Sequence, residues 1–209
     1  MRICVPLGAL LEESIDALTG VVDVAPLRDP GRRLVLEAPD GTTYITTRPS
    51  DVPTYVESGA ADVGIVGKDV LIERRPEVVE LLDLGFGGCR MVYATLDGDD
   101  PTEDAIARMG GVRVATKYVR VAHEHFAASG RRVEVVKVNG SVELGPLVGL
   151  ADGIVDLTAT GRTLRENGLV EREEIFTSTA RLIANRASYS LMAPQIDDLL
   201  ASIASPSSG

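Results

Sequence analysis

The stretch from Ile154 to Leu164, IVDLTATGRTL, combines residue types suited to binding a phosphorylated sugar. An apolar strand leads into Asp156, and a glycine between threonine hydroxyls follows within a few residues. A phosphate dianion needs several N–H donors on one side, and the first turn of a helix supplies them. Gly161 permits close approach and unusual torsions. Asp156 is placed to accept hydrogen bonds from ribose hydroxyls.

The predicted site, which we call the 156–163 segment, therefore contains a carboxylate, three hydroxyls and a glycine turn. Arg162 adds charge if its side chain points inward. A plain alternative fits the same residues, because a threonine often caps a helix that follows a strand. The sequence leaves both interpretations open. The residues of the segment are Asp156, Leu157, Thr158, Ala159, Thr160, Gly161, Arg162 and Thr163.

The totals exclude several classes of function. A net charge of −10 argues against general nucleic-acid binding, which requires a basic face. No apolar run approaches the ~20 residues that span a bilayer, so we expect no membrane partner. The N-terminus lacks the pattern of a secretory signal. Cys4 and Cys89 are too few for a disulfide framework, which indicates a cytoplasmic protein with reduced thiols.

A metal site is not predicted on the chain itself. His123 and His125 stand two apart on a predicted helix and point in different directions. No cysteine or acidic pattern completes a ligand set around them, so we expect a solvated helix face. The acidic run DGDDPTED is best explained as a loop and the first turn of a helix.

Strand and helix signals alternate along the chain, which predicts an α/β fold with largely parallel sheets. The main expected elements are a hairpin over 32–47, a helix capped by Ser50 or Asp51, a buried strand over 61–67, helices over 118–130, 141–151 and 161–168, a strand over 152–158, a strand near 176–185 and a helix over 193–204. The tail, 205–209, is expected to fray.

Two segments share a plan that suggests two similar lobes. GAADVGIVGKDVL (59–71) and GLADGIVDLTATGRTL (149–164) each read Gly-x-Ala-Asp, enter a buried strand and leave through a glycine-containing loop. Ligands of open α/β sheets bind outside the carboxyl ends of the strands. Two such ends would form a ligand cleft between lobes, although Gly-x-Ala-Asp is also a common way to leave a helix.

The region from Glu143 onward resembles the signature of the ATP phosphoribosyltransferase family, which opens histidine biosynthesis. The matching positions are Glu143, Gly149, Ala151, Ile154, Asp156, Thr160, Gly161 and Thr163. Blocks such as RPSDVPTYVESGAADVGIVGKDVL and VEVVKVNGSVEL also look like family blocks in family order, so that the resemblance covers nearly the whole chain. The length resembles the short form of the family.

The resemblance implies a reaction and a fold. N1 of ATP attacks C1 of phosphoribosyl pyrophosphate, and pyrophosphate leaves with Mg²⁺, which comes with the substrates. The fold would resemble type II periplasmic binding proteins, with residues 1–90 and 179–209 as the ATP lobe and 91–178 as the phosphoribosyl pyrophosphate lobe. A regulatory subunit that looks like a histidyl-tRNA synthetase would complete a hetero-oligomer.

Other candidate residues become meaningful on these terms. Arg48 and Arg32 are candidates for contact with pyrophosphate or the ATP phosphates, and Lys117 lies between a strand and a helix, a natural position for binding an anion. Glu143 is a candidate for a ribose hydroxyl or magnesium-bound water. Each has a plain alternative as a surface charge. Candidates for ATP binding are Gly8, Gly64, Gly67, Lys68, Asp69 and Tyr118, the last of which would stack on a base or face the core.

One departure from the family concerns the end of the first strand. The family reads Pro-Lys-Gly-Arg-Leu or similar there, whereas this chain has Leu7 and Ala9 in place of the two cations. Arg32, Arg33 or a partner subunit would then have to compensate. The departure keeps two alternatives open, a two-lobed protein that binds a small anion without catalysis and an inactive paralogue.

Overall fold

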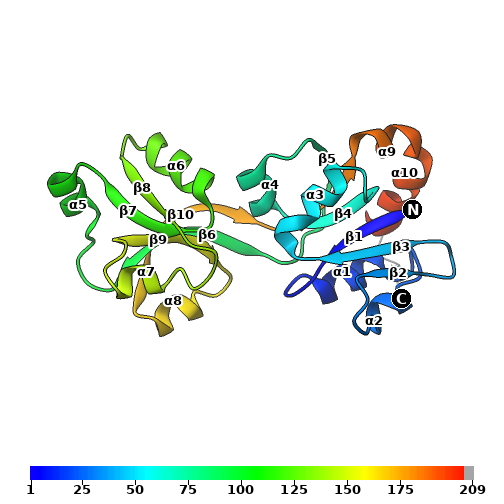
Figure 1. The fold of residues 1–209 in the computed structure, drawn as a ribbon, viewed down its shortest axis with the longest axis horizontal. Coiled ribbons are helices and arrows are strands. Elements are labelled where there is room, and N and C mark those ends of the chain that lie inside the picture. Colours follow the sequence, from blue (N-terminus) through cyan, green and yellow to red (C-terminus); the bar gives the residue numbers. More distant parts are fainter. Residues whose placement is uncertain (205–209) are drawn as a thin grey trace. The chain divides into compact units, whose positions relative to one another are not determined.

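The structure is a computed structural model that describes residues 1–204, so the expectation for 205–209 lies outside the described residues. Its backbone divides into two compact units (Figure 1). Unit 1 contains Met1–Gly87 and the chain from Thr179 on, and unit 2 contains Gly88–Ser178. Among residues 1–204 no helix is long and apolar enough to cross a membrane.

The first boundary lies between residues 87 and 88, three residues before the position expected from the sequence. The reason is that β6, Cys89–Leu96, begins to pair inside unit 2 at once. Arg90 lies opposite Thr158 on one side and Thr177 on the other.

In the described residues, unit 1 has one six-stranded sheet in the order β2-β3-β1-β4-β11-β5. Alternate side chains of β1 enter two cores, as the two-residue period of a strand requires. Ile3 and Val5 pack with α1 (Leu11–Leu18) and α10 (Ala193–Ala204), whereas Cys4 packs with α3 (Val52–Glu57) and α4 (Lys68–Arg74). The strands are β1 (Arg2–Pro6), β2 (Val35–Glu37), β3 (Thr43–Thr47), β4 (Val63–Gly67), β5 (Val78–Asp83) and β11 (Ala180–Asn185).

The helices of unit 1 cover both faces of this sheet (Figure 1). They are α1 (Leu11–Leu18), α2 (Ala25–Arg28), the 3₁₀ turn η1 (Pro49–Asp51), α3 (Val52–Glu57), α4 (Lys68–Arg74), α9 (Arg186–Leu191) and α10 (Ala193–Ala204). Neither Ser50 nor Asp51 caps α3 with its side chain, because Pro49 opens a 3₁₀ turn first and Asp51 Oδ1 instead lies near Arg74 Nη2, at 3.7 Å.

Unit 2 has, in the described residues, a five-stranded sheet in the order β10-β6-β9-β7-β8. One face packs against α8 (Arg162–Glu166) through Val92, Ile154 and Leu164. Gly145 of α7 (Leu144–Leu147) lies against Ala115 of the same cluster. Phe126 of α6 (Val119–Ala128) and Tyr93 of β6 form a T-shaped ring contact with centroids 5.1 Å apart. The further elements are α5 (Thr102–Met109), β7 (Val112–Thr116), α6 (Val119–Ala128), β8 (Val133–Lys137), α7 (Leu144–Leu147), β9 (Gly153–Thr158), α8 (Arg162–Glu166) and β10 (Leu169–Ser178).

The prediction of largely parallel sheets was wrong. β1 pairs in parallel with β3 and β4, and β7 with β8 and β9, but the other ladders of the described sheets are antiparallel. The cause is the path of the chain: β6 enters unit 2 from unit 1 and β11 returns, and each runs against its neighbours.

The prediction of a solvated histidine face was also wrong for His125. His125 Nε2 lies 2.7 Å from Glu173 Oε2 on β10, and Arg131 binds the same carboxylate with contacts of 2.6 and 2.7 Å. His125 therefore lies in hydrogen-bond contact with the Arg131–Glu173 ion pair, whereas His123 is exposed as expected. Among residues 1–204, no group of three or more His, Cys, Asp or Glu side chains could hold a metal ion.

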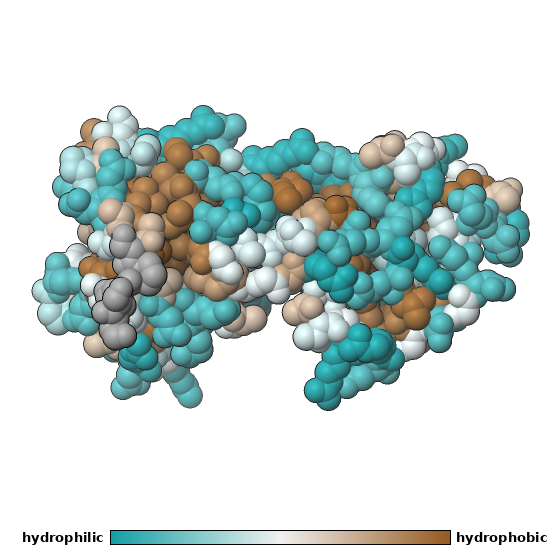
Figure 2. Space-filling model, turned by 180° about the vertical axis from the view of Figure 1, so that it is seen from behind, coloured by the Kyte–Doolittle hydropathy of each residue, from teal (hydrophilic) through white to brown (hydrophobic). Residues whose placement is uncertain are grey.

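Large hydrophobic side chains remain exposed on α7 and the turn that follows it. They are Leu144, Leu147, Val148 and Leu150. In Figure 2, which views the molecule from behind, a hydrophobic patch lies in the region of α7. This surface begins one residue after Glu143, so it borders the predicted site within unit 2.

Candidate functional site

β9 delivers the predicted acid and hydroxyl to one face of the unit 2 sheet. Asp156 and Thr158 lie two residues apart, as do Ile154 and Asp156, so all three side chains share a face. Ile154 packs with Leu164 of α8 in one hydrophobic cluster, which identifies that face as the one covered by α7 and α8. Asp156 lies inside the strand, with Thr158 at its end.

Asp156 is a half-buried carboxylate whose charge is not fully compensated. Burial raises the pKa of Asp156, whereas Lys117 and the main-chain N–H of Leu157 act in the opposite direction and Glu143 raises it further. The Lys117 Nζ to Asp156 Oδ1 distance is 3.7 Å. Among the described residues Asp156 Oδ1 is buried and has no hydrogen-bond partner. Such an atom is an acceptor suited to a hydroxyl donor from a ligand.

The turn after β9 is organised by threonine hydroxyls. The Gly161 N–H donates to Thr158 Oγ1 at 2.8 Å, and the Arg162 N–H donates to Thr160 Oγ1 at 3.4 Å. These two amides are therefore engaged within the segment. Fewer N–H donors remain open for a phosphate than the sequence predicted. No hydrogen bond of the described residues engages the N–H of Thr163 or Leu164, in the first turn of α8.

Gly161 is required by two features of this turn. Its φ of 70° lies in the left-handed region, which glycine adopts without strain. A Cβ at this position would lie 2.8 Å from Arg165 Nη1 and 3.0 Å from Glu171 Oε1. The glycine therefore lets two charged side chains approach the backbone that begins α8.

The other residues of the 156–163 segment differ in exposure. Thr158 is buried, whereas Ala159, Thr160 and Thr163 are exposed. Arg162 does not point inward: its side chain is 78% exposed and its Nε donates to Glu166 Oε1 at 2.7 Å. Leu157 is intermediate in exposure.

Lys117, Tyr118 and Glu143 also lie in unit 2. Lys117 Nζ is 5.0 Å from the centre of the Tyr118 ring, and its side chain remains 45% exposed. The Tyr118 ring is buried, and the Tyr118 N–H donates to Thr116 Oγ1 at 2.8 Å. The core-facing alternative thus describes Tyr118 in this structure. Tyr118 belongs to unit 2, whereas the other candidates for ATP binding belong to unit 1.

Several predicted residues of unit 1 gather at one edge of its sheet. β1, β3 and β4 run parallel, so their carboxyl ends share an edge. Gly8 follows β1, Arg48 follows β3 and Gly67 ends β4. Arg32 approaches the same edge, because the nearby Leu34 accepts a hydrogen bond from the Thr46 N–H at 2.9 Å. The side chains of Arg32 and Arg48 are exposed.

The residues of the predicted loop 64–69 have different environments. Gly64 lies inside β4, where a Cβ would be 2.8 Å from Val56, so it serves close packing of α3 on the sheet. Lys68 Nζ lies 2.6 Å from Glu80 Oε2, and both residues line a pocket of about 270 Å³ beside α4. Asp69 is buried in the first turn of α4 and lies against Gly67.

Sequence reasoning missed the charged residues that surround Gly161. Arg90 of β6 binds Glu171 and Glu174 of β10, and Arg165 of α8 lies beside the same turn. The partners are far apart in the sequence, so no local spacing could reveal them. The one available signal was the density of charge in VEREE, which no core strand needs.

The family model for HisG, ATP phosphoribosyltransferase, matches residues 48–205. The chain belongs to the ATP phosphoribosyltransferase family. It is 55% identical over 205 residues to the ATP phosphoribosyltransferase of Rubrobacter xylanophilus, with 97% of this chain and 94% of the relative covered. It is 44% identical over 200 residues to that of Aquifex aeolicus, with 96% and 92% covered.

Solved structures agree with this family assignment. The chain matches the ATP phosphoribosyl transferase (HisG:HisZ) complex from Thermotoga maritima with a TM-score of 0.81 and 32% identity, covering 98% of this chain and 96% of that one. It matches the periplasmic aliphatic sulphonate binding protein SsuA from Escherichia coli with a TM-score of 0.60 and 14% identity, covering 97% and 70%. The second match concerns the fold alone, which is the two-lobed fold of periplasmic binding proteins.

The ATP phosphoribosyltransferase model includes β9, the 156–163 segment, Lys117 and Glu143. It begins at Arg48, so Gly8 and Arg32 precede the matched range. The alignment with the relative from Rubrobacter xylanophilus nevertheless spans 97% of the chain. The candidate site of unit 2 therefore lies wholly within the part of the chain that defines the family.

Proposed function

We propose that the chain transfers the phosphoribosyl group of phosphoribosyl pyrophosphate to N1 of ATP, and that the 156–163 segment binds the sugar. The activity follows from family membership, since ATP phosphoribosyltransferases are pentosyl-transferring enzymes that open histidine biosynthesis. The assignment of the site residues is ours and rests on the environment of each side chain.

The observation that carries this assignment is the unpartnered oxygen of Asp156. Oδ1 is buried, has no hydrogen-bond partner among the described residues and lies 3.7 Å from Lys117 Nζ. Leaving a buried acceptor unsatisfied costs about 1–3 kcal/mol. A ribose hydroxyl would satisfy this oxygen. Burial raises the pKa of Asp156, and Lys117 opposes that rise and so favours the ionised form, which is the stronger acceptor.

The 5′-phosphate would bind at the start of α8. The N–H groups of Thr163 and Leu164 and the exposed hydroxyls of Thr160 and Thr163 provide donors there. Because Thr158 and Thr160 occupy two other amides, they fix the turn and leave their hydroxyl protons for donation. This arrangement uses hydrogen bonds and the partial positive charge of a helix start.

Displacement at C1 requires alignment and compensation of the charge that grows on pyrophosphate. Lys117 is our candidate in unit 2 for this compensation, and Arg48 and Arg32 are our candidates in unit 1. Mg²⁺, brought by the substrates, would supply further positive charge to the pyrophosphate. Glu143 raises the pKa of Asp156, which indicates that it is near enough to contact a ribose hydroxyl or a magnesium-bound water.

We assign ATP to unit 1, at the edge where β1, β3 and β4 end. Gly8, Arg48 and Gly67 lie there, followed by Lys68 and Asp69 in the first turn of α4. Arg32 and Arg33 are exposed near this edge and would replace the cations missing at Leu7 and Ala9. Gly64 supports the site through packing, and Tyr118 contributes from unit 2 through Lys117 rather than through a base.

A partner subunit is part of the proposal. The matched structure from Thermotoga maritima is that of a HisG:HisZ complex. We propose that this chain likewise assembles with a regulatory subunit, related to histidyl-tRNA synthetases, and that the assembly works in the cytoplasm. The exposed hydrophobic side chains on α7 leave room for subunit contacts on unit 2.

The test is to mix the purified chain, with and without such a subunit, with ATP, phosphoribosyl pyrophosphate and Mg²⁺, and to follow the ultraviolet absorbance of N1-alkylated adenine. We expect turnover, and we expect Asp156→Ala and Thr163→Ala to raise the KM for phosphoribosyl pyrophosphate about tenfold or more, the equivalent of one strong hydrogen bond. Arg162→Ala is the matched control, because its side chain faces solvent and Glu166.

Binding of both ligands without turnover would contradict the proposal and favour a small-anion-binding protein or an inactive paralogue. Loss of folding in Asp156→Ala and Thr163→Ala, with unchanged binding in whatever fraction remains folded, would instead support a plain helix cap.

A further inference from the structure

Arg90 makes a two-pronged ion pair on the face of unit 2 that carries Asp156. Its Nη1 lies 2.7 Å from Glu171 Oε2 and 3.1 Å from Glu174 Oε2, and its Nη2 lies 3.0 Å from Glu171 Oε1. The paired side chains are about one-third to one-half exposed, at 34% for Arg90, 30% for Glu171 and 47% for Glu174. Such a geometry positions both partners more firmly than a single contact would.

This ion pair adjoins the turn that begins α8. Glu171 Oε1 lies 3.0 Å from the place where a Cβ of Gly161 would be. Arg90 itself lies opposite Thr158 in the ladder between β6 and β9, and Thr158 Oγ1 accepts from the Gly161 N–H. Arg90 is therefore connected to the turn in two ways. Its backbone pairs with β9 at Thr158, and its side chain binds Glu171, which lies beside Gly161.

The charged side chains beside the turn are equal in number of positive and negative groups. The positive side chains are Arg90, Arg162 and Arg165, and the negative ones are Glu166, Glu171 and Glu174. A phosphate dianion bound at the start of α8 would be repelled by an uncompensated carboxylate a few ångströms away. Neutralisation of Glu171 therefore bears directly on the affinity of the turn for phosphate.

We propose that Arg90 is a positioning residue for substrate binding, which holds Glu171 beside Gly161 and cancels its charge so that the turn accepts the 5′-phosphate. The inference rests on the proposed function of the 156–163 segment. It assigns no contact between Arg90 and the substrate. Its distinguishing consequence is that loss of Arg90 weakens binding whereas loss of the Glu171 charge does not, although each residue is the other's partner.

The experiment measures binding of phosphoribosyl pyrophosphate with Mg²⁺ by calorimetry, on the full chain with its regulatory subunit, for R90Q, E171Q, the double variant R90Q/E171Q and R90K. We expect R90Q to weaken binding about tenfold, E171Q to leave it unchanged or tighten it up to about threefold, and the double variant to return within about threefold of E171Q. R90K keeps the charge but cannot form the two-pronged contact with Glu171, so it should bind with an affinity between those of R90Q and the wild type.

The KM for ATP should stay constant in all four variants, and melting temperatures would show which of them are folded. Equal weakening by R90Q and E171Q would mean that the pair is merely structural and would overturn the inference. An unrescued double variant would also overturn it, because Arg90 would then touch the substrate. Failure of the wild type to bind phosphoribosyl pyrophosphate would sink the proposed function itself, and this inference with it.

Discussion

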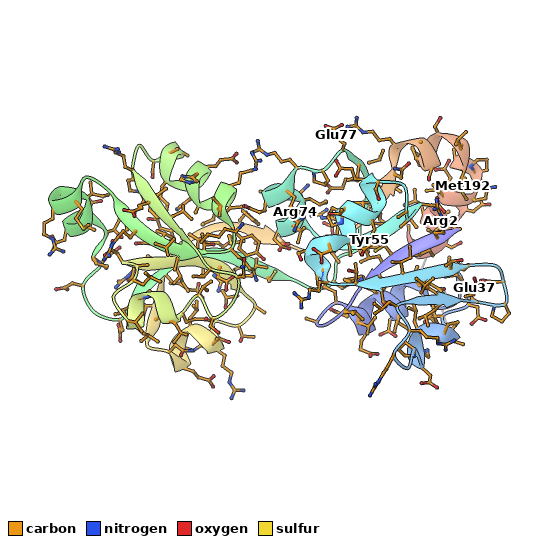
Figure 3. The ribbon with its side chains drawn as sticks, viewed as in Figure 1. Arg2, Glu37, Tyr55, Arg74, Glu77 and Met192 are labelled. Atoms are coloured by element: carbon orange, nitrogen blue, oxygen red, sulfur yellow. The ribbon has the colours of Figure 1, made fainter. Side chains whose placement is uncertain are left out.

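Arg113 donates three hydrogen bonds to the carboxylate of Asp152, at 2.8 Å from its main-chain N–H and at 3.4 and 3.0 Å from its guanidinium. Arg2, labelled in Figure 3, makes the same three hydrogen bonds to Asp62, at 2.8, 3.3 and 2.6 Å. In both units the aspartate N–H returns to the arginine carbonyl. The Gly-x-Ala-Asp repeat thus marks the same arginine–aspartate interaction in both units. In each unit it joins the start of one parallel strand to the start of its neighbour.

Replacing Asp152 by asparagine should destabilise the fold. Burial raises the pKa of Asp152, but the hydrogen bonds from Arg113 outweigh it and the net pKa is lowered. A carboxyl whose folded pKa is depressed contributes stability above its unfolded pKa of about 3.9, and that stability is lost as the pH falls through the folded pKa. We expect Asp152→Asn to lose about 1–3 kcal/mol at neutral pH.

Urea unfolding at pH 7 and at about pH 3 checks this prediction, since the variant should differ less from the wild type at the lower pH. Asp198→Asn, at an exposed position of α10, is the control. Equal effects of the two substitutions at pH 7 would contradict a stabilising role for the Arg113–Asp152 pair.

Asp156→Asn should have the opposite effect on stability. Burial raises the pKa of Asp156, so the folded state holds the proton more tightly than the unfolded state does. Ionisation of this group therefore opposes folding above the folded pKa, and that penalty vanishes below the unfolded pKa of about 3.9. We expect the amide to melt at a higher temperature than the wild type at pH 7, and to bind phosphoribosyl pyrophosphate more weakly.

Differential scanning calorimetry at pH 7, paired with ligand titration, measures both quantities on the same sample. A lower melting temperature together with unchanged affinity would show that Asp156 is a structural residue. Asp156 would then resemble Asp152, which provides the internal comparison.

Gly161→Ala should impair binding, and Gly168→Ala should not. Both glycines have a positive φ, of 70° and 67°, so alanine strains the backbone by about 1 kcal/mol at either position. Only at Gly161 would the new Cβ also meet Arg165 and Glu171, because nothing lies within 4 Å at Gly168. Comparable melting temperatures with a selective loss of affinity in Gly161→Ala would fit the structure. An equal loss of affinity in both variants would contradict a local role for Gly161.

The sequence predicted those parts of the fold that local patterns determine. β4 is a continuous apolar run, β9 begins as one, and the turn after β9 carries its own glycine and hydroxyls, so both strands and the segment were found. The family resemblance, carried by the positions from Glu143 to Thr163, gave the correct family and the two-lobed fold.

What the sequence could not show depends on partners distant in the chain. β10 was expected only from about residue 176, because its charged residues look like those of a solvent-facing segment; they pair with Arg90 and Arg131 instead. His125 was assigned to solvent for the same reason. The 3.7 Å approach of Lys117 to Asp156 joins a residue directly after β7 to a residue inside β9, which spacing alone does not relate.

Cys89 and Ser178 are opposite each other in the ladder between β6 and β10, at the two places where the backbone enters and leaves unit 2. Residues 88–178 therefore form a block whose two ends already touch. A block of this kind can be inserted into a host domain, or removed from it, without stretching the chain on either side. Changes within unit 2, to which we assign the sugar, therefore leave the backbone connections of unit 1, to which we assign the nucleotide, as they are.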